Sequence, residues 1–319
     1  MKPVMLLACV FLLCALDAGA MPQAYPSKPI RFVIPFSPGG TDIMGRVVAT
    51  AVSKSLGQMV VVDNRPGASG AIGAEIVVHA EPDGYTLLMT SSSYAASAAY
   101  RKLTYDPIRD IQPIILMATT GLIFVVHPSV LVKSIKELIA YAKANPGKLN
   151  YGSVGTGSIN HLAVELFKLK AGVNMVHIPY KGAGQALPAA VAGEIQLAPF
   201  GMVSTLPHVR EGRLRAIGVT TLKRSSLLPD VPAISETVHG YEVVHWYGIW
   251  GPKGLPKDIV QRWNSEVAKV LRMDEMKQRM RGEGLEPGDG PPEKFLKLIG
   301  GSVETWRNVI KEAKIKRAE

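Results

Sequence analysis

Apolar and polar residues alternate along this chain in a pattern that predicts an α/β fold. Short apolar runs, bounded by turn residues, precede longer stretches whose apolar residues recur at helical spacing. The first such run covers residues 30–35, and the stretch at 42–56 then places Val47, Val48 and Ala51 on one helical face. Regular alternation of strand and helix is typical of folds in which helices cover both faces of a sheet.

The same criteria predict the remaining elements in order. Strands are expected at 58–62, 85–90, 114–118, 122–126, 149–152, 175–179, 195–198, 214–220 and 241–250. Helices are expected at 70–79, 134–144, 158–171, 184–192, 257–271, 274–283 and 292–316. The alternation restarts from Ser134, and the chain is expected to cross between two lobes near 121–130 and to return near 238–244. The predicted lobes are residues 21–122 plus 241–319, and residues 123–240.

The first twenty residues have the pattern of a secretory signal peptide. Lys2 supplies a positive charge, an apolar run extends from Val4 to Leu16, and Ala18-Gly-Ala20 matches a cleavage site. This run is shorter than the roughly 20 apolar residues that a membrane-spanning helix needs. The sequence therefore predicts export, cleavage before Met21 and a periplasmic location.

Composition excludes several classes of protein. Both cysteines, Cys9 and Cys14, lie in the signal segment, so the mature chain is expected to have no disulfide, cysteine-ligated metal or cysteine nucleophile. A lipid anchor at Cys9 is disfavoured because this residue precedes most of the apolar run. The net charge of +10 suits attraction of anions. The sequence contains no basic stripe interleaved with aromatic residues and no zinc-finger spacing, so nucleic-acid binding is not expected. Its histidines are not spaced as metal ligands, so no metal or cofactor is expected.

Two glycine-rich turns carry the clearest chemistry. Pro35-Phe-Ser-Pro-Gly-Gly-Thr-Asp42 and Tyr151-Gly-Ser-Val-Gly-Thr-Gly-Ser158 each join a predicted strand to a predicted helix. Peptide N–H groups converge in such turns, and the helix adds a positive dipole end, which suits a carboxylate. The first turn matches neither the dinucleotide fingerprint nor a phosphate-binding loop. Thr41 or Asp42 is expected to cap its helix.

Other interpretations of these segments remain open at this stage. Ser153 or Ser158 with His161 as base would make a hydrolase, although the chain lacks a Gly-x-Ser-x-Gly elbow. The hydroxyls of residues 90–93 follow a strand and face either the cleft or an ordinary loop. Lys181 either attracts an anion or is a solvated lysine. The aromatic residues Tyr241, Trp246, Tyr247 and Trp250 are expected to pack the hinge and the sheet edge.

Seven segments in a fixed order carry a family resemblance. They are Tyr25-Pro-Ser-Lys-Pro-Ile-Arg31, Pro35-Phe-Ser-Pro-Gly-Gly-Thr-Asp42, Val61-Val-Asp-Asn-Arg-Pro-Gly-Ala68, Pro82-Asp-Gly-Tyr-Thr-Leu-Leu88, Pro146-Gly-Lys-Leu-Asn-Tyr-Gly152, Ile178-Pro-Tyr-Lys-Gly182 and Leu228-Pro-Asp-Val-Pro232. Together they resemble the Bug-type solute receptors of tripartite tricarboxylate transporters, over essentially the whole mature chain.

The resemblance implies a periplasmic, non-enzymatic receptor with a two-lobed, periplasmic-binding-protein-like fold. Each lobe would be a mixed sheet flanked by helices, and the lobes would close on a small carboxylic acid. The expected partners are membrane permease subunits or, alternatively, a sensor ectodomain; the receptor is expected to be a monomer without cofactor or metal. The expected ligand-binding residues are Phe36, Ser37, Pro38, Gly39, Gly40, Thr41, Asp42, Thr90, Ser91, Ser92, Ser93, Ser153, Gly155, Thr156, Gly157, Ser158, His161, Tyr180, Lys181, Gly182 and Phe200.

Three departures from the family pattern bear on the ligand. The first turn has one residue fewer between its glycine pair and Thr41, and the loop after Leu88 is about two residues shorter. Phe200 falls where many members carry an aspartate. A ring in place of a carboxylate predicts an acid without an ammonium group, and a more apolar one.

Overall fold

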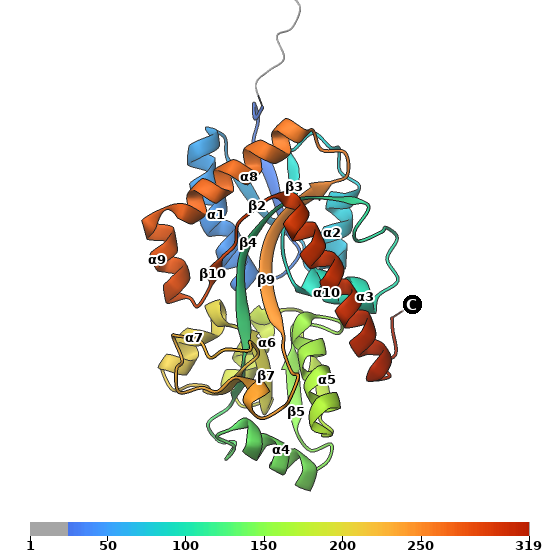
Figure 1. The fold of residues 1–319 in the computed structure, drawn as a ribbon, viewed down its shortest axis with the longest axis vertical. Helices are drawn as coiled ribbons and strands as arrows, with labels where there is room; N and C mark the ends of the chain where they lie inside the picture. Colours follow the sequence, from blue (N-terminus) through green and yellow to red (C-terminus); the bar gives the residue numbers. More distant parts are fainter. Residues whose placement is uncertain (1–24, 319) are drawn as a thin grey trace, which may run out of the picture.

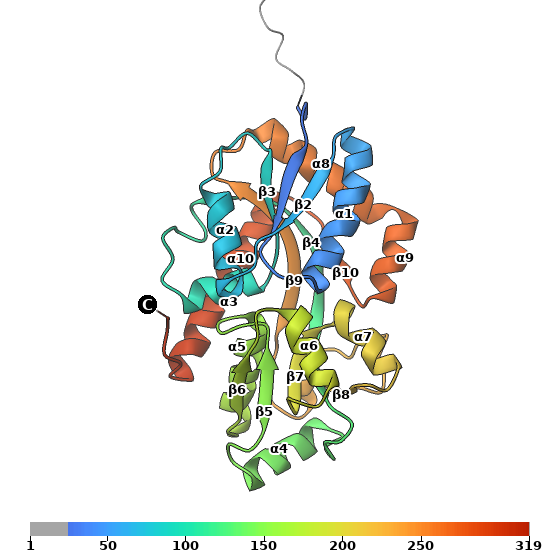
Figure 2. The same cartoon turned by 180° about the vertical axis from the view of Figure 1, so that it is seen from behind.

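The computed structural model describes residues 25–318, so the predicted signal peptide lies outside the described residues. The strands are β1 (Ile30–Ile34), β2 (Val60–Asn64), β3 (Thr86–Ser91), β4 (Ile111–Val126), β5 (Asn150–Ser153), β6 (Val176–Pro179), β7 (Leu197–Gly201), β8 (Arg215–Val219), β9 (Val244–Pro252) and β10 (Glu286–Pro287). The α-helices are α1 (Gly40–Leu56), α2 (Ala71–Val78), α3 (Ser93–Tyr100), α4 (Ile135–Ala144), α5 (Ile159–Ala171), α6 (Ala183–Val191), α7 (Met202–Arg210), α8 (Lys257–Arg272), α9 (Asp274–Gly282) and α10 (Pro292–Glu312). The predicted α/β class with mixed sheets and flanking helices is confirmed (Figures 1 and 2).

Two strands were expected at 114–118 and 122–126, and the structure replaces them with the single strand β4. The polar residues 119–121 read as a break in the sequence. Gly121 instead continues the strand, and a Cβ built there would lie 3.1 Å from Thr221 Cγ2, so a close neighbour explains the glycine. Helices α3 and α7 and the short strand β10 were not predicted either.

Strand β4 links two groups of strands. Residues 111–121 of β4 pair antiparallel with β9, which pairs antiparallel with β3; β3, β1 and β2 are parallel to one another. Residues 122–126 pair antiparallel with β7 and β8, and β5 lies parallel to β6 and β7. Figure 1 shows β4 and β9 side by side along the long axis. The lobe boundaries given above stay a prediction.

The core follows the alternation of side chains along each strand. Ile30, Phe32 and Ile34 of β1 pack in one cluster with α1 and α8, whereas Val33 packs on the opposite face in a cluster with α2, α3 and α10. Successive side chains of a strand point to opposite faces, so both faces of β1 are buried. This arrangement leaves the carboxyl ends of β1, β3 and β7 free to carry the turns described next.

Candidate functional site

A small pocket, which we call the central pocket, lies where the first glycine-rich turn meets residues of β7, α6 and β9. Its volume is about 50 Å³. Its lining residues are Phe36, Ser37, Gly39, Gly40, Thr41, Ser91, Ser93, Val154, Asn160, Gly182, Ala183, Phe200, Gly201, Ser204, His245 and Tyr247. This lining contains no Asp, Glu, Lys or Arg, so any charge on a ligand must be balanced by dipoles and hydrogen bonds.

Four helices begin in the wall of the central pocket. Helix α1 starts at Gly40, α3 at Ser93, α6 at Ala183, and α7 directly after Gly201. None of these four has a side-chain hydrogen bond at its N-cap. In contrast, the Ser158 side chain caps α5. Because first-turn N–H groups have no partner within a helix, four uncapped N-termini concentrate donors and positive potential on one small volume.

The Tyr247 hydroxyl lies between two of these helix starts. A Cβ built at Gly40 would be 3.2 Å from Tyr247 Oη, and one at Gly201 would be 3.3 Å from it. Burial raises the pKa of Tyr247, so the hydroxyl keeps its proton at neutral pH. Among residues 25–318 this hydroxyl has no hydrogen-bond partner. It is therefore available to donate to a ligand in the central pocket.

His245 adds a second neutral group on the same face of β9. Its Nδ1 lies 2.6 Å from the Ser92 hydroxyl. Burial lowers the pKa of His245 to about 4, so the imidazole is uncharged at neutral pH. Sequence reasoning assigned Tyr247 to sheet packing and gave His245 no role. Residues i and i+2 of a strand lie on the same face, so the sequence could have shown that His245 and Tyr247 share a face opposite Trp246.

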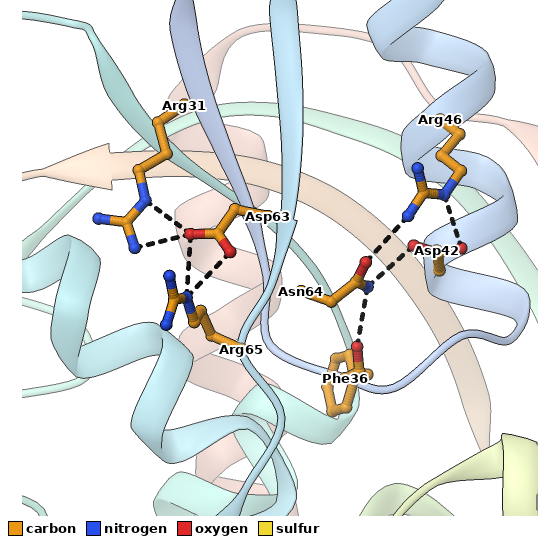
Figure 3. A network of polar contacts seen from close by, with 7 residues as sticks. All are labelled: Arg31, Phe36, Asp42, Arg46, Asp63, Asn64 and Arg65. Carbon is orange, nitrogen blue, oxygen red and sulfur yellow. Dashed lines mark hydrogen bonds and ion pairs between the residues drawn. The ribbon is translucent and has the colours of Figure 1, made fainter.

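A polar network behind the pocket holds the first turn in place (Figure 3). Asn64, at the end of β2, donates from Nδ2 to the Phe36 carbonyl at 3.0 Å and to Asp42 Oδ1 at 2.8 Å. Arg46 donates to Asp42 Oδ2 and to Asn64 Oδ1, each at 2.9 Å. Asp42 therefore anchors the turn from behind. The expectation that Thr41 or Asp42 caps α1 was wrong, because the helix begins at Gly40 with Gly39 as its N-cap.

The second glycine-rich turn satisfies its own polar groups. The Ser158 hydroxyl donates to the Gly155 carbonyl at 2.6 Å and accepts from the His161 backbone N–H at 3.3 Å. His161 Nδ1 accepts from the Gly157 N–H at 3.2 Å. Ser158 and the His161 ring thus form no nucleophile–base hydrogen bond. Ser153 is hydrogen-bonded to His177 Nε2 at 2.7 Å instead.

The structure separates the predicted ligand-binding residues into three sets. Nine line the central pocket: Phe36, Ser37, Gly39, Gly40, Thr41, Ser91, Ser93, Gly182 and Phe200. Four line a neighbouring pocket only: Gly155, Thr156, Tyr180 and Lys181. The rest line neither: Pro38, Asp42, Thr90, Ser92, Ser153, Gly157, Ser158 and His161. Ligand binding by any of them stays a prediction.

Several lining residues were not anticipated. They are Val154, Asn160, Ala183, Gly201, Ser204, His245 and Tyr247. Within the described part of the chain, no three His, Cys, Asp or Glu side chains gather closely enough to hold a metal ion. No helix in residues 25–318 combines the length and apolar character needed to cross a membrane.

Comparison with known proteins gives consistent matches along the chain. The family model described as tripartite tricarboxylate transporter family receptor matches residues 44–315. Protein BugT of Bordetella pertussis is 34% identical over 301 residues, which cover 92% of each chain. Two solved structures also match: Rpa4515 of R. palustris with adipate has 35% identity and a TM-score of 0.88, covering 92% of this chain and all of that one. MatC of Rhodopseudomonas palustris with bound malate has 28% identity and a TM-score of 0.85, covering 90% and 100%.

Proposed function

We infer the function of this chain from the family to which it belongs, the receptors of tripartite tricarboxylate transporters. It is a solute-binding protein that captures a small carboxylic acid for a transporter of this class. The relatives that bind adipate and malate support this ligand class. A similar solved structure is described as a periplasmic binding protein, which agrees with the predicted signal peptide. We propose that this chain is also periplasmic and is cleaved before Met21.

The observation that carries the proposal is the convergence of four uncapped helix N-termini on the central pocket. Fixed N–H groups and the neutral hydroxyls of Ser91, Ser93 and Tyr247 stabilise a carboxylate without a buried cation. A buried arginine or lysine would itself have to be desolvated before binding. The dipoles are already oriented, so they need no rearrangement when the anion arrives.

The same lining argues for an acid without an ammonium group. No carboxylate lines the central pocket, and the Phe36 and Phe200 rings supply apolar surface. An ammonium group there would lose its hydration without gaining a counter-charge, at a cost of several kcal/mol. We therefore propose a mono- or dicarboxylate rather than an amino acid as the solute.

We propose further that the protein acts without turning its ligand over. The hydrolase alternative needed Ser153 or Ser158 with His161 as base. The Ser158 hydroxyl instead donates to a backbone carbonyl, and Ser153 is hydrogen-bonded to His177, not His161, and lines neither pocket. The proposed partners are the membrane permease subunits of the transporter, which would receive the solute from a monomeric receptor.

Isothermal titration calorimetry with a panel of mono- and dicarboxylic acids tests the proposal. We expect one acid to bind with one-to-one stoichiometry and to be recovered unchanged. Tyr247→Phe should weaken its binding about tenfold, because one hydrogen bond to a charged group is lost. Tyr141→Phe is the matched control, since Tyr141 is exposed on α4, and it should bind as the wild type does.

Two outcomes would contradict the proposal. One is consumption of the acid or of its ester during the titration, which would indicate an enzyme. The other is tighter binding of aspartate than of succinate, because the two differ by an ammonium group for which the pocket has no counter-charge.

A further inference from the structure

A second pocket, which we call the side pocket, adjoins the central pocket. Its volume is about 400 Å³, and it is lined by residues 35–36, 66–70, 154–156 and 179–182 together with Arg101. Phe36, Val154 and Gly182 line both pockets. The boundary between them therefore consists of two apolar side chains and a glycine.

The side pocket is electropositive. Arg101 and Lys181 line it, and no Asp or Glu does. Among residues 25–318, Arg101 has no carboxylate within ion-pair distance. Its guanidinium makes one hydrogen bond, from Nη2 to the Thr156 carbonyl at 3.3 Å, and its buried Nε has no acceptor. A partly buried guanidinium with unused donors is a site for an anion, and a carboxylate fits its fork in a bidentate manner.

The guanidinium is held in position before any ligand arrives. Its Cζ lies 5.6 Å from the centroid of the Tyr100 ring, and the Thr156 carbonyl fixes one edge. The Ser69 hydroxyl donates to the same carbonyl at 2.8 Å. Ser69 and its neighbour Ala68 have positive φ angles of 55° and 48°, a left-handed conformation that side chains disfavour. Such strain persists only where surrounding contacts enforce it, and it is common at ligand sites.

We propose that the side pocket receives the second carboxylate of an elongated dicarboxylate whose first carboxylate occupies the central pocket. Arg101 is the partner of that second carboxylate, and the methylene chain passes between Phe36 and Val154. This inference rests on the proposed function, because it places one end of the ligand in the central pocket. It predicts selection for diacids over monoacids of equal length.

Calorimetry with matched pairs of straight-chain acids tests the proposal: succinate with butyrate, adipate with hexanoate, and suberate with octanoate. We expect the wild-type protein to bind at least one of these diacids about tenfold or more tightly than its matched monoacid. Arg101→Gln should abolish most of this preference and leave monoacid binding within about twofold. Arg101→Lys keeps the charge but not the bidentate fork, and it should give an intermediate preference.

Lys102→Gln is the charge-matched control, since Lys102 is the exposed neighbour of Arg101, and it should leave the diacid preference unchanged. Equal affinities for mono- and diacids at every length in the wild-type protein would overturn the inference without any variant. An equal loss of affinity for the diacid and the monoacid in Arg101→Gln would also overturn the inference. That result would leave the proposed function of the central pocket standing. If no acid bound the wild-type protein, the proposed function itself would fail, and this inference with it.

Discussion

His161 and His177 stack on each other beneath the second glycine-rich turn, with ring centroids 4.1 Å apart. The Tyr151 ring stacks on His177 at 4.9 Å, and Tyr100 meets His161 edge-on. Each histidine forms one hydrogen bond with the turn. His161 accepts from the Gly157 N–H, and His177 is hydrogen-bonded to the Ser153 hydroxyl. A proton on either ring would place a cation in a largely desolvated site that already lies near the positive charge of Lys168. The bond from the Gly157 N–H therefore requires a His161 imidazole with no proton on Nδ1.

At the residue scale, these histidines predict loss of stability in mild acid. Burial lowers the pKa of His161 to about 4 and that of His177 to about 3, from an ordinary value of 6.5. Lys168 lowers the pKa of His161 further; His161 and Lys168 lower that of His177, and Glu165 opposes them. Burial also lowers the pKa of His245 to about 4. Below pH 6.5 the unfolded chain therefore binds more protons than the native one. The free energy of unfolding should keep the whole contribution of these histidines above pH 6.5. It should fall by a few kcal/mol as the pH drops towards 4.

Urea unfolding at pH 7.5 and pH 4.5 measures this loss. His245→Gln should make the difference between the two pH values smaller, because one titrating group is removed. His239→Gln alters an exposed histidine and should leave the difference unchanged. Equal midpoints at both pH values in the wild-type protein would show that the buried histidines do not titrate as proposed.

At the scale of single elements, α10 shows how an amphipathic helix supports the strands that carry the site. Its buried residues recur at helical spacing and include Phe295, Ile299, Val303 and Trp306. The Phe295 ring packs against β9, where a Cβ built at Gly248 would lie only 2.2 Å from Phe295 Cζ. The ring also meets Trp246 edge-on at 5.3 Å. Gly248 thus makes room for a ring that holds α10 on β9.

Phe295→Ala should lower the free energy of unfolding by about 3–5 kcal/mol, because a fully buried ring leaves a cavity. Urea denaturation at pH 7.5 measures the change. Lys297→Ala, an exposed position on the same helix, should change it by less than about 0.5 kcal/mol. Since Phe295 does not line the central pocket, acid binding by the folded variant should stay close to that of the wild type. A loss of affinity without a loss of stability would assign α10 a role in binding.

At the scale of the whole molecule, a basic protein surrounds a pocket without fixed charges. The net charge is +10, and none of the residues that line the central pocket is ionic. The distributed charge therefore acts on a ligand at long range, before contact, and the helix N-termini act at short range. Salt screens the first effect far more strongly than the second, because the Debye length falls to about 10 Å at 0.1 M.

The association rate constant for the acid should accordingly fall several-fold between 20 and 200 mM NaCl, while the dissociation rate constant changes little. Stopped-flow tryptophan fluorescence at a series of salt concentrations separates the two rate constants. Repetition in sodium fluoride at equal ionic strength distinguishes screening, which depends on ionic strength alone, from competition by chloride. A salt effect confined to dissociation would contradict long-range attraction.

The elements of the fold could largely be predicted from the sequence, because they depend on near neighbours in the chain. Helical spacing identified α1 and α8, and apolar runs identified β1 and β3. Prediction from the sequence failed where contacts with residues far away in the chain overrode the local sequence pattern. Residues 119–121 look like a break, yet pairing with β9 carries β4 through them. The serines at 92–93 look like a loop, yet α3 begins there.

The sequence by itself determined the α/β class, the two glycine-rich turns and the resemblance to carboxylate receptors, because periodicity and turn chemistry are written in adjacent residues. Only the tertiary structure decided which groups meet. It placed the Tyr247 hydroxyl between Gly40 and Gly201, turned Ser158 inward as a cap, and brought Arg101 to the Thr156 carbonyl. These contacts join residues far apart in the chain, and their distances depend on how strands and helices pack, which no local pattern encodes.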